Sequence, residues 1–388
     1  MYVAKIVYHI TVFTFFFNIL KISFTALIIA YEQMKMFAYV SLLEVFLKLL
    51  CAYLIFLNFN VDKLIVYSIL LLLTSVIIFL AYFFYTRKKF EVSRFSFFYD
   101  RNLYAELLSF SGWSLFGSIA GVAKSQGINI LLNIFFGTIL NAAYGITMQI
   151  NAAVYLLITN FKTAIDPQII KSYSQSNGND FLSLVFKGSK FAFLLTLSLS
   201  SLILFNLDYI LFLWLDTVPE YASSFIKLSL LTLTIDSLSM SLMTAFNATG
   251  KIRNYQIIVG SLLILNLPLS FTFLKYTKVS PVFIFEVALL LSVISLLSRL
   301  LLMKQVISYS LLSYSKKVLL PVVLVSFFIF AGITIVRYFN DIVVTSFVSL
   351  ILSSLGLMIW NVIITYSFGL DKSEKIYVQS FLKTFKLS

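Results

Sequence analysis

The sequence predicts an all-α polytopic membrane helix bundle with about eleven transmembrane helices. Of its 388 residues, 60% are hydrophobic and only 12% are charged, whereas soluble domains carry about 25% charged residues. The apolar residues form long continuous runs, such as 64–80, and most basic residues gather in alternate joints between these runs. This composition excludes a soluble globular enzyme and a disordered chain. It also excludes a single-span receptor, because no half of the sequence returns to ordinary composition.

Each predicted helix is a run long enough to cross a bilayer, which takes about 20 mostly apolar residues. The joints between the runs are short and polar, so they leave no room for a soluble domain. The runs do not alternate with the period of two residues that is typical of membrane β-barrels. They lie at about 4–31, 37–57, 63–85, 107–137, 140–165, 184–206, 222–248, 255–274, 281–303, 318–337 and 342–368.

The basic residues predict which way the helices run. Twenty of the 29 Lys and Arg residues fall on one side of the predicted bundle, against five on the other side and four within the helices. Cytoplasmic loops collect Lys and Arg, so the richer side, which includes the C-terminal tail, is predicted to be cytoplasmic. Its members include Arg87, Lys190, Lys251 and Arg299. Topology therefore explains the formal net charge of +13, and no nucleic-acid partner is needed.

Eleven spans with a cytoplasmic C-terminus would place Met1 outside, although the sequence begins with no signal-peptide pattern. We therefore expect the chain to begin inside a longer parent protein. The basic, aromatic segment 86–106 is expected to connect two lobes at the cytoplasmic surface, where anionic lipid would attract it.

Few residues could carry catalysis or bind a metal. The chain has one cysteine, Cys51, and one histidine, His9, which excludes a disulfide framework and a cysteine-based metal site and leaves little basis for a histidine-centred one. Residues 248–251 (ATGK) lack the glycine spacing of a phosphate-binding loop and follow a predicted helix rather than a strand. We therefore predict no catalytic residue, no metal and no cofactor.

Several separate blocks of sequence occur in an order that indicates a family. They are Ser111-Gly112-Trp113 with Phe135-Phe136-Gly137, Pro167-Gln168-Ile169, Leu213-Trp214-Leu215, and Ala248-Thr249-Gly250 with Leu267-Pro268-Leu269. Through these blocks the chain, over about residues 5–320, resembles bacterial polysaccharide flippases. These proteins, also called O-antigen or lipopolysaccharide exporters, belong to the multidrug/oligosaccharidyl-lipid/polysaccharide (MATE-like) superfamily.

The resemblance implies two lobes of six helices around a central cavity, with optional extra helices at the end. Residues 1–100 would then be a remnant of the N-terminal lobe, with three helices and a basic linker, that lacks the first three helices. Residues 101–304 would be a complete C-terminal lobe of six helices. Residues 305–388 would be a terminal helix pair with a basic cytoplasmic tail.

The function implied by the resemblance is a flippase that moves a lipid-linked oligosaccharide across the bacterial inner membrane by alternating access. The substrate would be an undecaprenyl-pyrophosphate-linked O-antigen or capsule repeat unit, and the partners would be this substrate and membrane lipid. One alternative is a cation-coupled multidrug exporter of the same fold, and another is a truncated remnant that transports nothing. A membrane polymerase or acyltransferase is disfavoured, because such enzymes usually need a sizeable outer loop or a histidine-centred group.

Lys124 is the leading candidate for substrate binding, because an ionisable side chain at the centre of a membrane helix costs about 2.5–3.5 kcal/mol. It borders a polar helical stripe that includes Gln126, Asn129 and Asn133. A stripe of this kind turns towards water or another helix, so these residues are expected to bind the phosphates and sugars in a wet cavity. The alternative for Lys124 is a structural ion pair with Asp236, and Asp236 could instead be a proton or cation site.

Three more charges fall inside the first two predicted helices. Glu44 and Lys48 are four residues apart with the acid first, which is the favourable order for a helical ion pair. They form either a self-neutralising pair or part of a cavity. Lys21 lies too far from both membrane interfaces to reach them easily, so it is expected to face a cavity or a partner helix.

Overall fold

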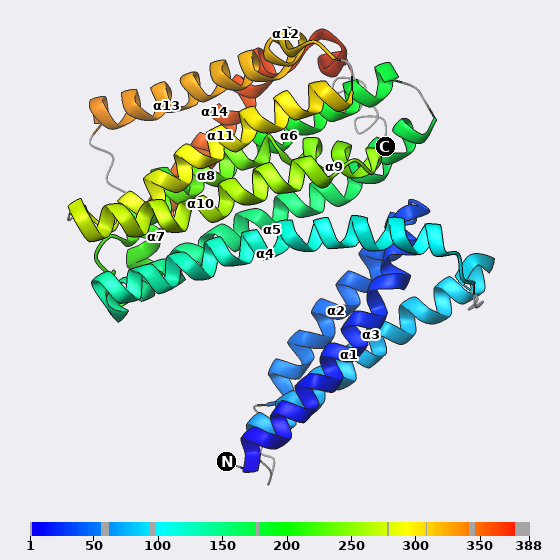
Figure 1. Ribbon diagram of the computed structural model, residues 1–388. Coiled ribbons are helices and arrows are strands. Elements are labelled where there is room, and N and C mark those ends of the chain that lie inside the picture. Colours follow the sequence, from blue (N-terminus) through cyan, green and yellow to red (C-terminus); the bar gives the residue numbers. More distant parts are fainter. Residues whose placement is uncertain are drawn as a thin grey trace, which may run out of the picture. The chain divides into compact units, whose positions relative to one another are not determined.

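Helices account for all the regular structure in the described part of the chain, which is shown as a computed structural model in Figure 1. The described residues are 2–55, 62–93, 98–175, 178–277, 279–307, 309–340 and 346–376. They contain no strand, and they include 11 helices that are long and apolar enough to cross a membrane. The predicted all-α polytopic bundle is therefore confirmed. Residues 94–97 of the predicted linker and 377–388 of the predicted tail lie outside the described residues.

The helices that could span a membrane follow the predicted runs. The first six are α1 (Tyr2–Ala30), α2 (Met34–Leu54), α3 (Lys63–Lys89), α4 (Arg101–Phe136), α5 (Thr138–Ser174) and α6 (Gly178–Phe205). The seventh span consists of α8 (Ala222–Ser237) and α9 (Met240–Thr249), and it is followed by α10 (Arg253–Thr277) and α11 (Phe283–Val306). The last two combine α12 (Leu311–Tyr314), the π-helical turn η2 (Ser315–Leu319) and α13 (Leu320–Asn340), and then α14 (Phe347–Ile364) with the π-helical turn η3 (Thr365–Gly369). The short helices α7 (Leu207–Trp214) and η1 (Glu91–Ser93) lie in the joints.

Several helices extend beyond the apolar runs that predicted them, and α4 and α5 are two examples. Helix α4 begins at Arg101, six residues before the predicted start. Its first turns contain polar residues, so a search for apolar runs did not include them. Helix α5 continues through the buried Pro167 to Ser174, whereas the predicted run stopped at 165. Proline removes a backbone donor and bends a helix, but membrane helices tolerate it where neighbouring groups satisfy the freed carbonyl.

The chain divides after Asp100 into two compact units. The first unit contains α1, α2 and α3, which pack against one another. Its small core is built from Ile28, Val40 and Ile78, together with Tyr82 and Phe90 at one end. In α1 and α2 few residues are buried, so most of their apolar surface lies outside this core.

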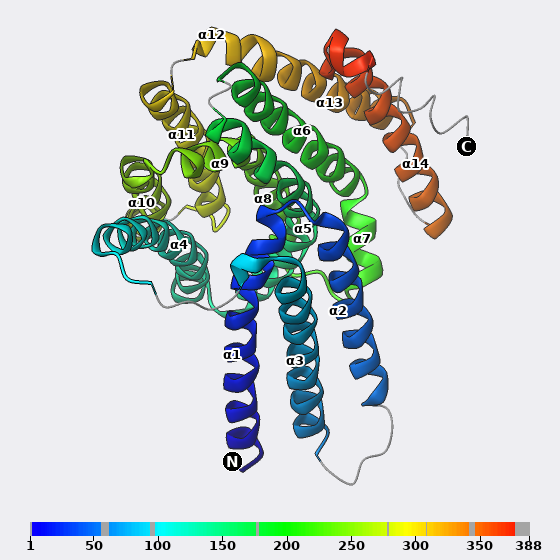
Figure 2. The same ribbon diagram turned by 90° about the vertical axis from the view of Figure 1, so that its right-hand side faces the viewer.

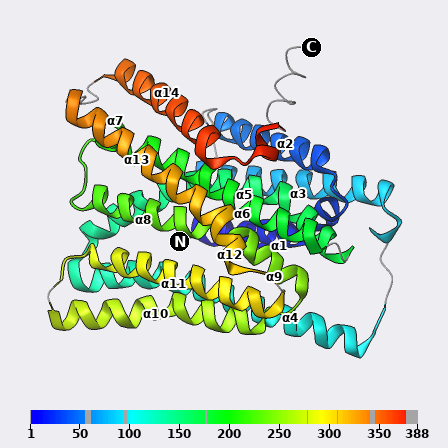
Figure 3. The ribbon, with the colours of Figure 1, turned by 90° about the horizontal axis from the view of Figure 1, so that it is seen from above.

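The second unit, Arg101–Ser388, contains all the remaining helices. Helix α4 packs along α10, α10 along α11 and α11 along α8, while α5 contacts α4, α6, α8 and α9. Figure 3 shows α10 and α11 side by side, and in Figure 2 α13 and α14 lie beyond α6, away from α4 and α10. Residues 101–304 and the described part of 305–388 therefore belong to one unit, in which α6 connects the six-helix bundle to the last two spans.

Polar side chains hold the last span against α6. The amide of Asn361 in α14 donates to Ser201 Oγ over 2.9 Å, and Ser353 Oγ donates to Asn206 Oδ1 over 2.7 Å. Beyond η3, the Lys190 ammonium in α6 forms a buried ion pair with Glu374, at 2.5 Å. Hydrogen bonds between helices replace the hydrophobic driving force that is missing in lipid, so these contacts explain how two strongly apolar spans are attached to the bundle.

The close contact between α4 and α10 depends on a glycine. A Cβ atom added at Gly260 would lie 2.7 Å from Cε1 of Phe116 and 3.5 Å from Cβ of Ala120. We expect Gly260→Val to destabilise the protein by about 1–3 kcal/mol, because the added side chain overpacks this contact. Unfolding by SDS in mixed micelles measures this loss. Gly112→Val in α4 is the control, since an added Cβ there meets nothing within 4 Å; equal unfolding of both variants would show that the contact is dispensable.

Candidate functional site

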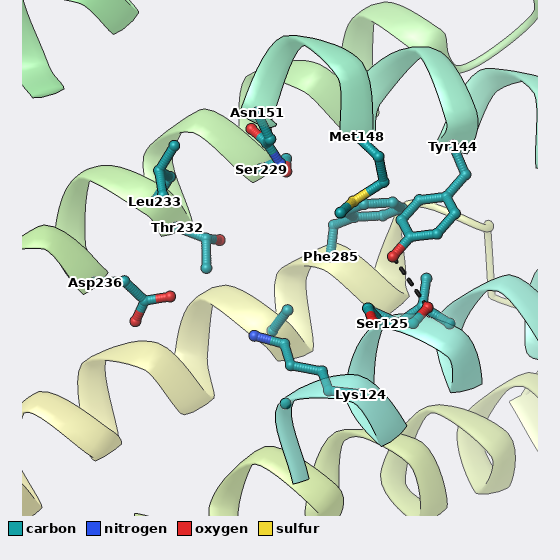
Figure 4. Close-up of a pocket in the computed structure, with 13 residues that line it drawn as sticks. Lys124, Ser125, Tyr144, Met148, Asn151, Ser229, Thr232, Leu233, Asp236 and Phe285 are labelled. Atoms are coloured by element: carbon teal, nitrogen blue, oxygen red, sulfur yellow. Dashed lines mark hydrogen bonds between the residues drawn. The ribbon is translucent and has the colours of Figure 1, made fainter. Parts of the chain in front are cut away.

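A cavity of about 200 Å³ lies inside the second unit, between α4, α5, α8 and α11 (Figure 4). Helix α4 and helix α8 supply most of its polar side chains, while α5 and α11 supply aromatic and apolar ones. The polar lining consists of Lys124, Ser125, Asn151, Ser229, Thr232 and Asp236. The rest of the lining consists of Gly121, Ile128, Tyr144, Met148, Leu233, Phe285 and Ala288.

Lys124 brings the only lysine or arginine side chain to this lining. It shares one face of α4 with Gly121, Ser125 and Ile128, which lie one turn before, next to and one turn after it. The absence of a side chain at Gly121 leaves room beside the lysine stem. Figure 4 shows the ammonium directed across the cavity towards α8. Within the described residues, this ammonium makes no hydrogen bond and no ion pair.

Asp236 faces the cavity from the last turn of α8. Between α8 and α9, Leu238 and Ser239 keep helical backbone angles and donate to the carbonyls three residues before them, so the seventh span tightens there but continues. The Asp236 carboxylate accepts a hydrogen bond from Ser292 Oγ, at 2.6 Å. Lys124 and Asp236 both line the cavity but do not form an ion pair within 4.0 Å.

Asn151 and Ser229 form the other polar wall, and neither is among the residues predicted from the sequence. The Asn151 amide donates to Ser229 Oγ, which links α5 to α8. The Asn151 carbonyl oxygen is buried and has no hydrogen-bond partner among the described groups. A buried acceptor without a partner costs about 1–3 kcal/mol, so this oxygen is available to a donor in the cavity. The one sequence signal for Asn151 and Ser229 is that each is a polar residue near the middle of an apolar run.

Three of the predicted residues on α4 do not line the cavity. Gln126 and Asn133 are exposed and Asn129 is half-buried, and the cavity lining contains none of them. The predicted stripe covers a wide arc of the helix. Helix α4 packs against α10, with Gly260 at the contact. In this orientation the side of the stripe that carries Lys124 and Ser125 faces the cavity. The rest of the stripe faces away from it.

The predicted charges of the first unit form one network. Glu44 accepts from Lys48 over 2.8 Å within α2 and from Lys21 of α1 over 3.4 Å. Of the two predicted environments of Lys21, a cavity or a partner helix, the structure shows the partner helix. With two lysines and one carboxylate, the network keeps a formal charge of +1. It belongs to the first unit, and the cavity belongs to the second.

Arg299, which the charge pattern counts on the predicted cytoplasmic side, falls within the predicted run 281–303. It lies inside α11, seven residues before the helix ends, and only 6% of its surface is exposed. Its Nη1 donates to Ser239 Oγ over 2.9 Å, between α8 and α9. The buried guanidinium therefore links α11 to the seventh span.

Comparison with known proteins identifies the segment that carries the cavity. Residues 115–272 match the family described as MatE. The match contains all six polar residues of the lining, from Lys124 to Asp236. No curated protein and no solved structure matches the chain. The MatE match supports a transporter of the MATE-like superfamily, whose members are not enzymes. Together with the 11 apolar helices, it indicates a multi-pass membrane protein.

Proposed function

We propose that this protein is a flippase for a lipid-linked oligosaccharide that carries a pyrophosphate, and that Lys124 binds this pyrophosphate. The substrate would be an undecaprenyl-pyrophosphate-linked repeat unit of O-antigen or capsule, moved across the bacterial inner membrane with the basic side of the bundle facing the cytoplasm. The observation that carries the proposal is the cavity at Lys124, whose ammonium has no counter-ion among the described residues.

The physical argument starts from the cost of an unpaired charge. A lysine at the centre of a membrane helix costs about 2.5–3.5 kcal/mol on insertion scales, and such residues usually face water or a substrate path. A positive charge in a medium of low dielectric constant attracts an anion much more strongly than it does in water. Besides Lys124, the polar lining holds the neutral groups of Ser125, Asn151 and Thr232 and one carboxylate, Asp236. A single lysine in such a lining suits a transporter, because binding has to be reversible.

The neutral polar wall suits the remaining part of the substrate. Sugars present hydroxyl groups that both donate and accept, and the unpartnered Asn151 carbonyl accepts from such a group. Phe285 and Tyr144 add aromatic surface at the same cavity. The cavity itself holds only a headgroup-sized part of the substrate, so the prenyl chain would remain in lipid.

One observation favours the second candidate, a cation-coupled multidrug exporter. Asp236 places a carboxylate near the middle of the seventh span, on the same cavity. A carboxylate of this kind is suited to take up a proton or a cation, and it would attract a cationic drug. In this alternative Lys124 would repel the cationic substrate, just as Asp236 would repel an anionic one. We prefer the anionic substrate because Asp236 already accepts a hydrogen bond from Ser292 Oγ, whereas the Lys124 ammonium has no partner among the described residues.

Transport by the purified protein in proteoliposomes tests the proposal. Three compounds are compared: a short-chain prenyl-pyrophosphate oligosaccharide, a neutral prenyl glycoside with the same sugars, and a lipophilic cationic dye. We expect the pyrophosphate compound to be translocated faster than in liposomes without protein, and the neutral glycoside at the background rate. Translocation of the dye alone, driven by a proton or sodium gradient, would establish the multidrug exporter instead.

A further inference from the structure

A second polar cavity, of about 190 Å³, lies where α6 begins, near η2 and the segment that follows η3. Three of the residues that line it are lysines, two from α6 and one from η2. They are Lys187, Lys190 and Lys317. Asp371 and Glu374 line the opposite side. This basic pocket shares no lining residue with the cavity at Lys124.

Both carboxylates of the basic pocket are engaged through one oxygen each, and Glu374 Oε1 is buried without a partner among the described groups. Glu374 Oε2 binds the Lys190 ammonium at 2.5 Å and accepts from the backbone N–H of Asp371 at 2.9 Å. Asp371 Oδ1 accepts from the Glu374 N–H at 2.9 Å and from Ser373 Oγ at 2.7 Å. Although burial opposes it, these bonds hold the pKa of Asp371 below its ordinary value, so the group is ionised and occupied at neutral pH.

Two lysines of the basic pocket are left without an anion. Within the described part of the chain, Lys187 and Lys317 make no hydrogen bond and no ion pair. Lys187 is half-buried and Lys317 is exposed. They come from different helices and converge on one concave surface, so this surface is suited to hold an anionic group between them.

An apolar groove continues from the basic pocket along the same helix. It has a volume of about 550 Å³ and lies between α5, α6 and α14, with Phe191, Leu194 and Leu195 on one side and Val362 and Tyr366 on the other. A single stripe of α6, with steps of three or four residues, connects the two: Ser183, Lys187 and Lys190 line the pocket, and Leu194 and Ser198 line the groove. Opposite this stripe, residues 361–370 line the groove and 371–374 line the pocket.

The length of this combined surface matches one leaflet of a bilayer. From Ser183 to Leu199 the helix rises by about 24 Å, at about 1.5 Å per residue. Half of a bilayer, with its headgroup region, measures about 20–22 Å. The polar end would then lie at the level of the headgroups, and the apolar end among the acyl chains.

We propose that this surface is a binding site for one anionic phospholipid of the leaflet on the basic side. The lipid phosphate lies between Lys187 and Lys317, and an acyl chain follows the groove between α6 and α14. The Lys190–Glu374 ion pair forms the floor of the site and holds the segment after η3 in place. The site is independent of the proposed flippase activity, because no residue of the central cavity takes part in it.

Lipid titration of the purified full chain tests this site. The protein is titrated in a neutral detergent with short-chain phosphatidylglycerol or phosphatidylcholine, and bound lipid is counted by native mass spectrometry. We expect one tightly bound phosphatidylglycerol. The double variant Lys187→Gln/Lys317→Gln should bind it about 30-fold more weakly, since each lysine near a lipid headgroup contributes about fivefold. Lys187→Arg/Lys317→Arg should bind it as the wild type does.

The matched control removes two charges that do not line the pocket. Lys304→Gln/Lys316→Gln changes the net charge equally, and both of its lysines are exposed. This control should bind phosphatidylglycerol normally. Unchanged binding by Lys187→Gln/Lys317→Gln, or an equal loss in both double variants, would overturn the proposal.

A second pair of variants tests the groove, and so distinguishes a lipid from a free anion. Val362→Trp fills the groove from α14 and should weaken phosphatidylglycerol binding, whereas Val348→Trp, at an exposed position of α14 outside the groove, should not. If Val362→Trp has no effect and inorganic phosphate competes with the lipid, the pocket binds a free anion. If a prenyl pyrophosphate displaces the lipid at equal concentration, the surface belongs to the substrate path. Either result contradicts a phospholipid site.

Discussion

Replacing Lys124 with glutamine should lower the transport of a pyrophosphate-linked substrate about 10- to 150-fold. A hydrogen bond to a charged group contributes about 1.5–3 kcal/mol, and Lys124 is the only cation on the cavity lining. Lys124→Arg keeps the charge and should retain most of the activity. Initial rates in proteoliposomes measure both variants, with the amount of inserted protein determined for each. Lys227→Gln is the matched control, because Lys227 is an exposed lysine of α8 that does not line the cavity.

Asp236 separates the binding role of Lys124 from a structural one. The two side chains do not form an ion pair within 4.0 Å in this structure, so removing Asp236 should not rescue a Lys124 variant. We expect Lys124→Ala/Asp236→Ala to insert normally and to remain inactive. If the double variant recovers both its protein level and its transport, Lys124 and Asp236 form a structural pair in the working protein, and our assignment of Lys124 is incorrect.

Breaking the Lys190–Glu374 pair should cause the largest loss of stability. The side chains of Lys190 and Glu374 are 4% and 6% exposed, and their atoms are 2.5 Å apart. Removing one partner of a buried ion pair costs about 3–5 kcal/mol, because the other charge stays buried. We therefore expect Lys190→Met to lower the free energy of unfolding by this amount, as measured by SDS titration. Proteolysis of the segment after η3 should also become faster, since this pair fixes the segment to α6.

A double substitution tests the cause of that loss. Apolar replacement of both partners often restores the stability of a buried pair, so Lys190→Met/Glu374→Leu should be more stable than Lys190→Met. Lys316→Met at an exposed position should change the unfolding free energy by less than about 0.5 kcal/mol. A single variant as stable as the wild type would mean that water reaches the pair through the basic pocket.

The sequence by itself determined the class of the molecule and the number of its membrane helices. This is possible because every span meets the same physical requirement, a hydrophobic length of about 30 Å, which can be counted along the chain. The same reasoning identified Lys124 and Asp236, because a charge in an apolar run is conspicuous whatever the neighbouring helices are. It was weaker where a run ends, as the start of α4 at Arg101 and the continuation of α5 through Pro167 show.

Only the tertiary structure decided which of the polar residues share a site. Helix α4 packs on α10 through glycines of both helices, Gly117, Gly127 and Gly260. In this orientation Lys124 lines the cavity, and Gln126 and Asn133 are exposed.

Asn151 and Ser229 meet across 78 residues, and Lys190 and Glu374 across 184. Such pairs depend on which helices are neighbours. The sequences of apolar spans of similar length hardly predict which of them will pack together. It is made by close packing and by a few hydrogen bonds between helices, because lipid solvates every apolar helix face equally well.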